Sequence, residues 1–481
     1  MLKKSNGKVC KNKINVVPLQ PQIRNGTLAE RLGNGLQNRV EQFDSARYLF
    51  HKRGFLLSRY PPFCLFTPLK VMKRLLSTLF ICLVTLTAIH AQYHRILSED
   101  IRSLQVVADN DWQQLPVIRL DDGKIDIDFD RLGHGFDRYT YKIEHCEANW
   151  DLSSELFSSD YLSGFPDGNT IDDMVESINT NTPYTHYHLT LPNDQCKMKM
   201  SGNYRVSIYK DGEEEPAIEA CFMVVEQKVS IRMEMTTNTD IDSHAHHQQI
   251  SMQVGYGPLR ITHPQTQIKT VLMQNREWFD ARVNVKPQFT MADGLRWEHC
   301  RDYIFTGGNE FHKFEILSTD NPSMGIEHVD WDGKNYHAYP YVDAPRHNYL
   351  YDESAQGAYI LRNSDNSEST YTSDYMDVHF EVKTDAPVPG DLYVSGDWTF
   401  CSFDDAYKMT YDGESRSYKL AIPLKLGYYS YQYLMKDYSG RIVRPPFEGS
   451  FHETHNTYQS LVYYRAPGDR TDRLVGYATL Q

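Results

Sequence analysis

The chain has 481 residues and a formal net charge of −13 at pH 7. Residues 92–481 carry 35 Lys and Arg against 60 Asp and Glu, a net charge of −25, which excludes binding of nucleic acid or anionic headgroups through a broad basic face. This segment of roughly 390 residues exceeds what one hydrophobic core usually supports, so two to four domains are expected.

Residues 1–71 differ in charge from the rest of the chain. They contain 13 Lys and Arg against three acids, and no sustained helical or strand period. Five prolines interrupt them: Pro18, Pro21, Pro61, Pro62 and Pro68. We expect a disordered or non-native upstream extension, with Met72 as the true initiator. Native peptides from before Met72 would contradict this expectation.

Residues 72–91 read as a complete secretory signal. Lys73 and Arg74 form its charged region, Leu75 to Ile89 its apolar region, and Ile89-His90-Ala91 its cleavage site. The mature chain then begins near Gln92, outside the cytoplasm. An apolar run of about 15 residues is short for a membrane span of roughly 20. A membrane anchor and a buried core helix are the alternatives.

Residues 92–226 predict a first β-sandwich, because short alternating runs are separated by turn signals. The expected strands are 124–130, 139–145, 201–209 and 220–225, with a helical candidate at Thr170–Ile178. Asp126, Asp128 and Asp130 alternate along the first of these strands. A solvated strand face explains them better than a calcium loop, whose glycine and distal Glu are missing.

Residues 227–375 predict a second sandwich, with strands at 228–235, 268–273 and 311–317 and an interdomain linker at 363–373. His244, His246 and His247 form the one metal-like cluster. They lie in a polar segment without Asp, Glu or Cys at ligand spacing, so solvated loop histidines are the alternative to a metal site.

Residues 376–466 predict a third sandwich, followed by a C-terminal tail at 467–481. Its expected strands are 376–382, 391–396, 418–422 and 427–433. Val394–Trp398 followed by Gly427–Tyr433 resembles the glycogen-binding type of early-set β-sandwich, although the first segment is one or two residues short. Trp398 is therefore a candidate carbohydrate contact by stacking. Packing at a loop corner is the alternative.

The mature chain has five cysteines, at 146, 196, 221, 300 and 401, with no CxxC pair. At most two disulfides are possible, and buried free thiols are the alternative. No GxSxG, HExxH, P-loop or GxGxxG motif appears. The sequence thus predicts an all-β chain of three consecutive immunoglobulin-like or early-set sandwiches, with no cofactor and no catalytic residues.

A long series of spaced motifs resembles one family, the type IX secretion system plug proteins of Bacteroidetes. The resemblance extends from about Arg102 to Tyr477. It is carried by His145–Trp150, Tyr161–Pro166, Asn181–Tyr187, Leu189–Asn193, Ser201–Tyr204, Gly307–Phe311, Gly427–Tyr429 and Gly468–Tyr477.

The resemblance implies a non-enzymatic role. Such proteins associate with the periplasmic end of the outer-membrane β-barrel translocon and block its channel while no substrate passes. It therefore implies a periplasmic location at the inner face of the outer membrane, with no membrane span in the mature chain. It identifies no interface residues. A secreted carbohydrate-binding protein using Trp398 and an uncharacterised hydrolase are the alternatives.

Overall fold

The protein is all-β and built of several sheets, as the alternating sequence patterns predict. The computed structural model describes residues 94–365 and 368–481, which belong to one compact unit, Ala88–Gln481. The predicted upstream extension (1–71) and the predicted signal peptide (72–91) lie outside the described residues. Within these residues, every helix is too short or too polar to cross a membrane.

The first sandwich packs two sheets around one core. One sheet has the order β1-β12-β11-β5-β7, with β3 beside β12: Arg95–Ile96, Ile218–Val225, Gly202–Lys210, Tyr139–Cys146, Asn169–Thr170 and Val117–Arg119. The other has the order β2-β4-β9-β8: Ile101–Ala108, Ile125–Leu132, Tyr184–Leu191 and Asp173–Glu176. A short pair, β6 (Leu162–Gly164) and β10 (Cys196–Met198), follows α2 (Ser158–Tyr161).

Strand alternation explains this packing. Ile125, Ile127 and Phe129 of β4 are fully buried in the core of the first sandwich. The intervening Asp126, Asp128 and Asp130 lie on the opposite face of the sheet, because successive side chains of a strand point to opposite sides.

The second sandwich combines strands from the middle and the end of the chain. One sheet has the order β13-β14-β18-β17, with β19 on β14: Ser230–Thr236, His247–Gly255, Gly294–Trp297, Phe289–Thr290 and Ile304–Thr306. The other has the order β16-β15-β30-β31: Arg282–Val283, Ile268–Gln274, Tyr458–Tyr464 and Arg473–Leu480. The short helix α3 (Pro264–Gln267) lies between the two sheets in the chain, whereas η2 (Trp278–Asp280) and η3 (Arg301–Tyr303) each join two strands of one sheet.

The third sandwich has its own core of aromatic and aliphatic side chains. In one sheet β28 (Gly427–Asp437) pairs with β20, β23, β25 and β29: His312–Ile316, Tyr359–Leu361, Gly390–Ser395 and Ile442–Val443. The other has the order β21-β22-β24-β27-β26: Ile326–Trp331, Tyr336–Pro340, Tyr375–Lys383, Ser417–Lys425 and Thr410–Asp412. The short helices are α4 (Ser369–Thr372), η4 (Asp397–Thr399), η5 (Asp405–Tyr407) and η6 (Pro446–Glu448).

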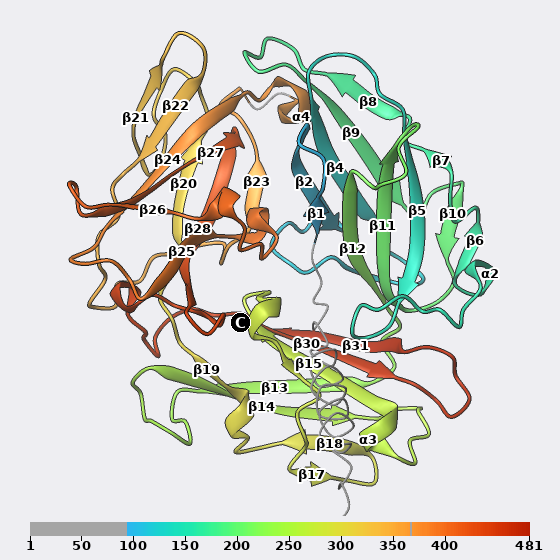
Figure 1. Cartoon of the computed structure of the whole chain (residues 1–481). Helices are drawn as coiled ribbons and strands as arrows, with labels where there is room; N and C mark the ends of the chain where they lie inside the picture. Colours follow the sequence, from blue (N-terminus) through green and yellow to red (C-terminus); the bar gives the residue numbers. More distant parts are fainter. Residues whose placement is uncertain (1–93, 366–367) are drawn as a thin grey trace, which may run out of the picture. The chain divides into compact units, whose positions relative to one another are not determined.

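Strand pairing does not follow the predicted boundaries at 375/376 and 466/467. Strands β20 to β23, expected in the second sandwich, pair within the third, and β30 and β31 return to the second (Figure 1). Alternation along a strand reports its buried face but carries no information on which distant strand is its neighbour. The segment 467–481 is therefore mostly an edge strand rather than a tail.

Two further local predictions are wrong. Thr170–Ile178 is not helical, because β7 and β8 occupy most of it as strands. The expected linker 363–373 joins β23 to β24 inside the third sandwich, and it contains α4. Its Asn363 and Ser373 are buried and hydrogen-bonded to each other.

Candidate functional site

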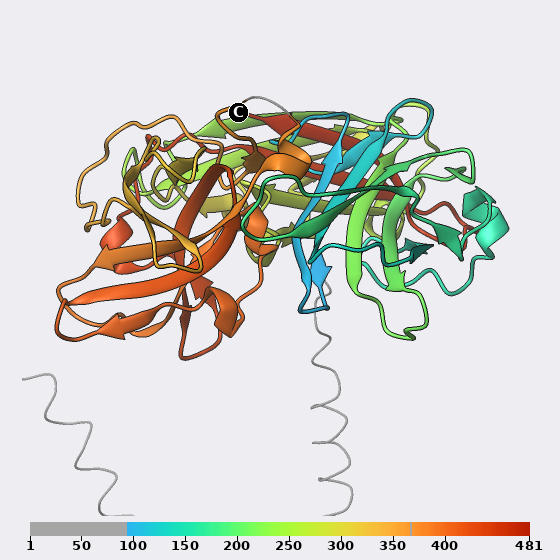
Figure 2. The ribbon, with the colours of Figure 1, turned by 90° about the horizontal axis from the view of Figure 1, so that it is seen from above.

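The three sandwiches are joined by side chains that are far apart in the sequence. In both ribbon views the first and third sandwiches lie beside each other, and each also lies beside the second sandwich (Figures 1 and 2). A fourth apolar cluster fills the junction of the first and second sandwiches: Leu115, Cys146, Trp150, Cys221, Met223 and Val225 meet Val271, Met273, Leu461, Tyr463 and Leu474. Burial of these apolar side chains removes their surface from water, and this stabilises the junction in the same way as a hydrophobic core.

Two of the spaced motifs meet at this junction. The Ala148 amide donates to Asp472 Oδ2 at 3.2 Å, and the Asp472 amide donates to Glu147 Oε2 at 3.0 Å. The Asp472 carboxylate is almost fully buried and accepts from Lys269 Nζ at 2.7 Å. Burial raises the pKa of Asp472, but Lys269 and the hydrogen bond from the Ala148 amide lower it by more, so the pKa lies below its ordinary value and the carboxylate stays ionised. Residues 145–150 and 468–473 are thus a structural clasp.

His145 of the same motif is a structural histidine. Its Nε2 is 3.3 Å from the carbonyl of Ser201 and its Nδ1 is 2.8 Å from Ser153 Oγ. Burial lowers the pKa of His145 to about 4, so the imidazole is neutral. Gly202 has φ +147°, and a Cβ there would lie 2.2 Å from His145 Nε2. The neighbouring Ser-Gly-Asn-Tyr motif therefore requires glycine to make room for this ring.

Arg276 joins all three sandwiches. Its Nε donates to Asp397 Oδ2 at 2.9 Å, and Nη1 donates to the carbonyl of Gln113 at 2.8 Å. Nη2 donates to the carbonyls of Ala355 and Gln356 at 3.1 and 2.8 Å. Arg276 is buried, with φ +63°, so the backbone adopts a left-handed conformation to place it.

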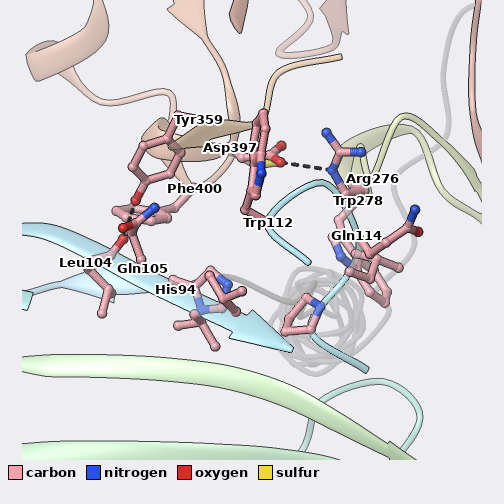
Figure 3. A pocket seen from close by; sticks show the side chains of 15 residues that line it. His94, Leu104, Gln105, Trp112, Gln114, Arg276, Trp278, Tyr359, Asp397 and Phe400 are labelled. Carbon is pink, nitrogen blue, oxygen red and sulfur yellow. Dashed lines mark hydrogen bonds and ion pairs between the residues drawn. The ribbon is translucent and has the colours of Figure 1, made fainter. Parts of the chain in front are cut away.

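A cavity of about 100 Å³ lies beside Arg276 (Figure 3). Figure 3 shows the Arg276 guanidinium directed at Asp397, and the Tyr359 hydroxyl directed at the carbonyl of Leu104. Small-molecule sites typically have about 300–1,000 Å³. This cavity is therefore a gap at the three-way junction rather than a site for a substrate.

A second buried charge cluster lies inside the third sandwich. His312 Nδ1 is 3.0 Å from Asp343 Oδ1, and Nε2 is 3.1 Å from Glu448 Oε1. A neutral imidazole donates only one hydrogen bond, so two carboxylate contacts favour the imidazolium. Burial lowers the pKa of His312, but the two carboxylates raise it more, to about 9.

We expect the stabilisation from His312 to disappear in alkaline solution. Its pKa of about 9 exceeds the ordinary value of 6.5, so the charged ring contributes about 3 kcal/mol below pH 6.5. This contribution is lost as the pH rises through 9. Urea unfolding of the wild type and His312→Gln should show a large difference at pH 6 that shrinks by pH 10. An equal difference at both pH values would contradict the expectation.

The three candidate metal ligands each have a different partner. His244 Nδ1 is 2.7 Å from Thr237 Oγ1, His246 Nδ1 is 2.7 Å from the carbonyl of Ser450, and His247 Nδ1 is 2.8 Å from Asp242 Oδ2. Among the residues that the structure describes, no group of three His, Cys, Asp or Glu side chains is placed to hold a metal ion. The geometry favours hydrogen-bonded loop histidines.

Trp398 packs in the core of the third sandwich and is 5 % exposed. Its ring lies parallel to Phe380 and edge-on to Tyr429, with centroids 6.0 and 5.8 Å apart. The indole N–H donates to the carbonyl of Ser430 at 3.1 Å. Stacking on a sugar requires an open ring face. The burial of the indole favours packing over the candidate carbohydrate contact at Trp398.

We expect Trp398→Phe to lower the free energy of unfolding by about 1–2 kcal/mol, because one buried hydrogen bond and part of a ring are lost. Migration through a glycogen-containing native gel should be the same for the variant and the wild type. Retardation of the wild type alone would restore Trp398 as a sugar contact.

The alternating carboxylates of β4 are not a solvated strand face. Asp130 is fully buried, and its partners are His186 and Lys425. Asp128 contacts His186 and His188. The sequence pattern identified the face on which these carboxylates lie, but the strand that covers it comes from the third sandwich.

The cysteines pack as small apolar side chains. Cys146, Cys196 and Cys300 are buried free thiols, and Cys401 is a half-buried one, while Cys221 is buried. Burial raises the pKa of Cys146 and of Cys401 to about 12. Such thiols are poor nucleophiles at neutral pH.

The fold and these junctions define an all-β protein whose three sandwiches are locked together by buried ion pairs and a shared apolar cluster. Residues 101–226 match the family model of the type 9 secretion system plug protein 1st domain. A crystal structure of a hypothetical protein from Parabacteroides merdae is 35% identical, with a TM-score of 0.77, over 81% of this chain and 98% of its own. No curated protein matches. The chain belongs to the type 9 secretion system plug protein family, which confirms the resemblance and places the protein in type IX secretion at the cell envelope.

Proposed function

We propose that this protein closes the periplasmic end of the outer-membrane β-barrel translocon of the type IX system while no cargo passes. Membership of the plug family carries the proposal. The protein then acts by occupying space rather than by chemistry. Consistent with this, His145 of the His145–Trp150 motif is buried and neutral, and both of its ring nitrogens contact hydrogen-bond partners.

The interlocked junctions support a stopper function. A translocon wide enough for folded cargo leaks unless its closure is rigid against thermal motion. Arg276 fixes four acceptors on two other sandwiches, and Asp472 fixes the clasp between the first and second. Relative domain motion is the default for weakly joined domains, so these buried links favour one rigid body.

Export is the second part of the proposal. Residues 72–91 direct the chain across the inner membrane, and cleavage near Ala91 releases a soluble mature protein that reaches the translocon from the periplasm. N-terminal sequencing of the protein recovered from the periplasmic fraction should begin near Gln92. Recovery with the uncleaved apolar segment would replace this with a membrane-anchored protein.

Affinity capture tests the partner. The tagged protein, purified from native membranes in mild detergent, should bring down a large outer-membrane β-barrel that mass spectrometry identifies. A strain that lacks the translocon barrel is the control. Only the barrel should be missing from the proteins captured from that strain. Capture of soluble polysaccharide enzymes instead would contradict the proposal.

A leak assay tests the closure itself. Deleting the gene should make cells sensitive to a large antibiotic that the outer membrane normally excludes, and only if the translocon barrel is present. Complementation with the wild type should restore resistance. Equal sensitivity with and without the barrel would show that the protein does not close it.

A further inference from the structure

A ladder of alternating charges runs along the outer face of β4 and β9 in the first sandwich. We call it the Asp–His ladder; its members are Asp126, His188, Asp128, His186 and Asp130. His188 Nδ1 is 2.7 Å from Asp128 Oδ1, and its Nε2 is 3.8 Å from Asp126. His186 Nε2 is 3.3 Å from Asp128 Oδ1, and its Nδ1 is 2.7 Å from Asp130 Oδ1.

The ladder leads from solvent into the junction with the third sandwich. The side chain of His188 is 33% exposed, that of His186 8%, and that of Asp130 1%. At the buried end Asp130 Oδ2 accepts from Lys425 Nζ at 2.6 Å and from the Tyr375 hydroxyl at 2.7 Å. Tyr375 and Lys425 lie directly opposite each other in the pairing of β24 with β27. The third sandwich therefore docks one cation on the end of the ladder.

The net charge of the ladder on which Lys425 docks depends on whether His186 and His188 are protonated. With both imidazoles protonated the ladder has three negative and two positive charges, whereas with both neutral it has three negative charges only. A cation docks more strongly on the second arrangement. His186 and Lys425 also share one carboxylate, so a proton on His186 places two cations on the same group.

Burial lowers the pKa of Lys425 itself and Asp130 raises it, so loss of the Lys425 proton at high pH opposes the tightening. The remaining groups around the ladder do not reverse the dependence on the two imidazoles. On β8, Asp173 lies opposite His188 and adds a negative charge. On β2, Arg102 lies opposite Asp130 but donates to the carbonyls of Glu99 and Ile101. From the third sandwich, Tyr375 has a pKa raised well above 10 by burial, so it stays neutral. Asp374 is held by two backbone amides of the first sandwich.

We propose that the junction between the first and third sandwiches is a proton-sensitive latch, which tightens when the Asp–His ladder loses protons and loosens when the ladder gains them. The proposal does not depend on the translocon as partner. Its physical basis is the arrangement of one docking cation, Lys425, on a carboxylate already shared with a histidine.

The causes of the His186 pKa support this direction. Burial and Lys425 both lower the pKa of His186, and both belong to the closed junction. Asp128 and Asp130 raise it, and both belong to the first sandwich itself, where they hold the pKa above 6.5. Opening the junction removes the lowering causes, so the open form binds protons more tightly. By linkage, acid favours the open form.

Three amides of the first sandwich report on the junction. Ile178 N–H donates to the carbonyl of Tyr371 at 2.9 Å, and the amides of Asn181 and Thr182 donate to Asp374 at 2.5 and 3.0 Å. All three acceptors belong to the third sandwich. The nearby amide of Ser177 donates to Tyr184 within the first sandwich and serves as the internal reference.

Hydrogen exchange of the full mature chain at pH 6 to 9 tests the proposal. After correction for the intrinsic exchange rate, protection of the three junction amides should rise about three- to tenfold from pH 6 to pH 9, since one pKa unit is a factor of ten. Protection of Ser177 should not rise with it. Junction protection that is flat or falls over this range would overturn the proposal.

Variants of the ladder sharpen the test. His186→Gln keeps a donor for Asp130 without the charge, so its junction protection at pH 6 should already match that of the wild type at pH 9. His188→Gln, at the more exposed end, should show the same effect to a smaller extent. If His186→Gln does not fold, His188→Gln decides, and unchanged protection at pH 6 overturns the proposal.

His312→Gln is the matched control. His312 also lies between two carboxylates, but both are in the third sandwich and away from the ladder. This variant should be less stable and yet keep the pH dependence of the junction amides. Loss of that dependence in His312→Gln would show that general destabilisation, rather than the ladder, controls the junction.

Discussion

Replacing Arg276 with methionine is expected to lower the free energy of unfolding by about 3–5 kcal/mol. The change leaves Asp397 and three backbone carbonyls without their donor, in a region where Arg276 itself is only 7 % exposed. Removing one partner of a buried charge pair costs this much, because the remaining groups keep their desolvation penalty. Urea unfolding followed by tryptophan fluorescence measures the difference.

Two further variants define the role of Arg276. Arg276→Lys keeps the charge but cannot present a fork of donors to four acceptors, so it should lie between the wild type and Arg276→Met. Arg441→Met removes a guanidinium from an exposed pair with Asp437 and should change stability little. Equal effects of Arg276→Met and Arg441→Met would show that the three-way junction does not depend on Arg276.

Several of the longer strands could be predicted from local alternation, whereas β2, β9, β14 and β30 were not among the expected strands. Ile125, Ile127 and Phe129 alternate with carboxylates, and Tyr429, Tyr431 and Tyr433 alternate along β28; both runs are strands with buried apolar faces. The period of two is a property of the strand itself, so it survives any choice of neighbour. The helical prediction for Thr170–Ile178 was wrong because short strands at a sheet edge have too few alternating residues to be distinguished from a helical turn.

The junctions could not be predicted, because their partners are set by tertiary structure. Lys425 is 295 residues from Asp130, and nothing beside either residue indicates the other. Arg276 comes shortly after a buried strand, where a charged residue is common, so its position in the sequence does not indicate its role at the junction. The same limit explains Trp398, whose Gly-Asp-Trp context is compatible with an open loop or with a core. The return of β30 and β31 to the second sandwich is a pairing choice that alternation does not encode.

The buried pair of Lys425 and Asp130 gives the second large expected effect. Lys425→Met should lower the free energy of unfolding by about 3–5 kcal/mol, because a carboxylate that is 0 % exposed loses its strongest partner. Lys425 Nζ also donates to the carbonyl of Thr370 and lies 4.1 Å from the centre of the Tyr184 ring. Methionine fills a similar volume, so the loss comes from the charge rather than from a cavity.

A double-mutant cycle separates the pair from its surroundings. Lys425→Met combined with Asp130→Asn removes the uncompensated charge, so the double variant should recover much of the stability that Lys425→Met loses. Lys419→Met, on the same strand, removes a lysine from the exposed pair with Asp412 and should have little effect. If the double variant is as unstable as the sum of the single ones, the two groups act independently. The buried charge would then not be what joins the third sandwich to the first.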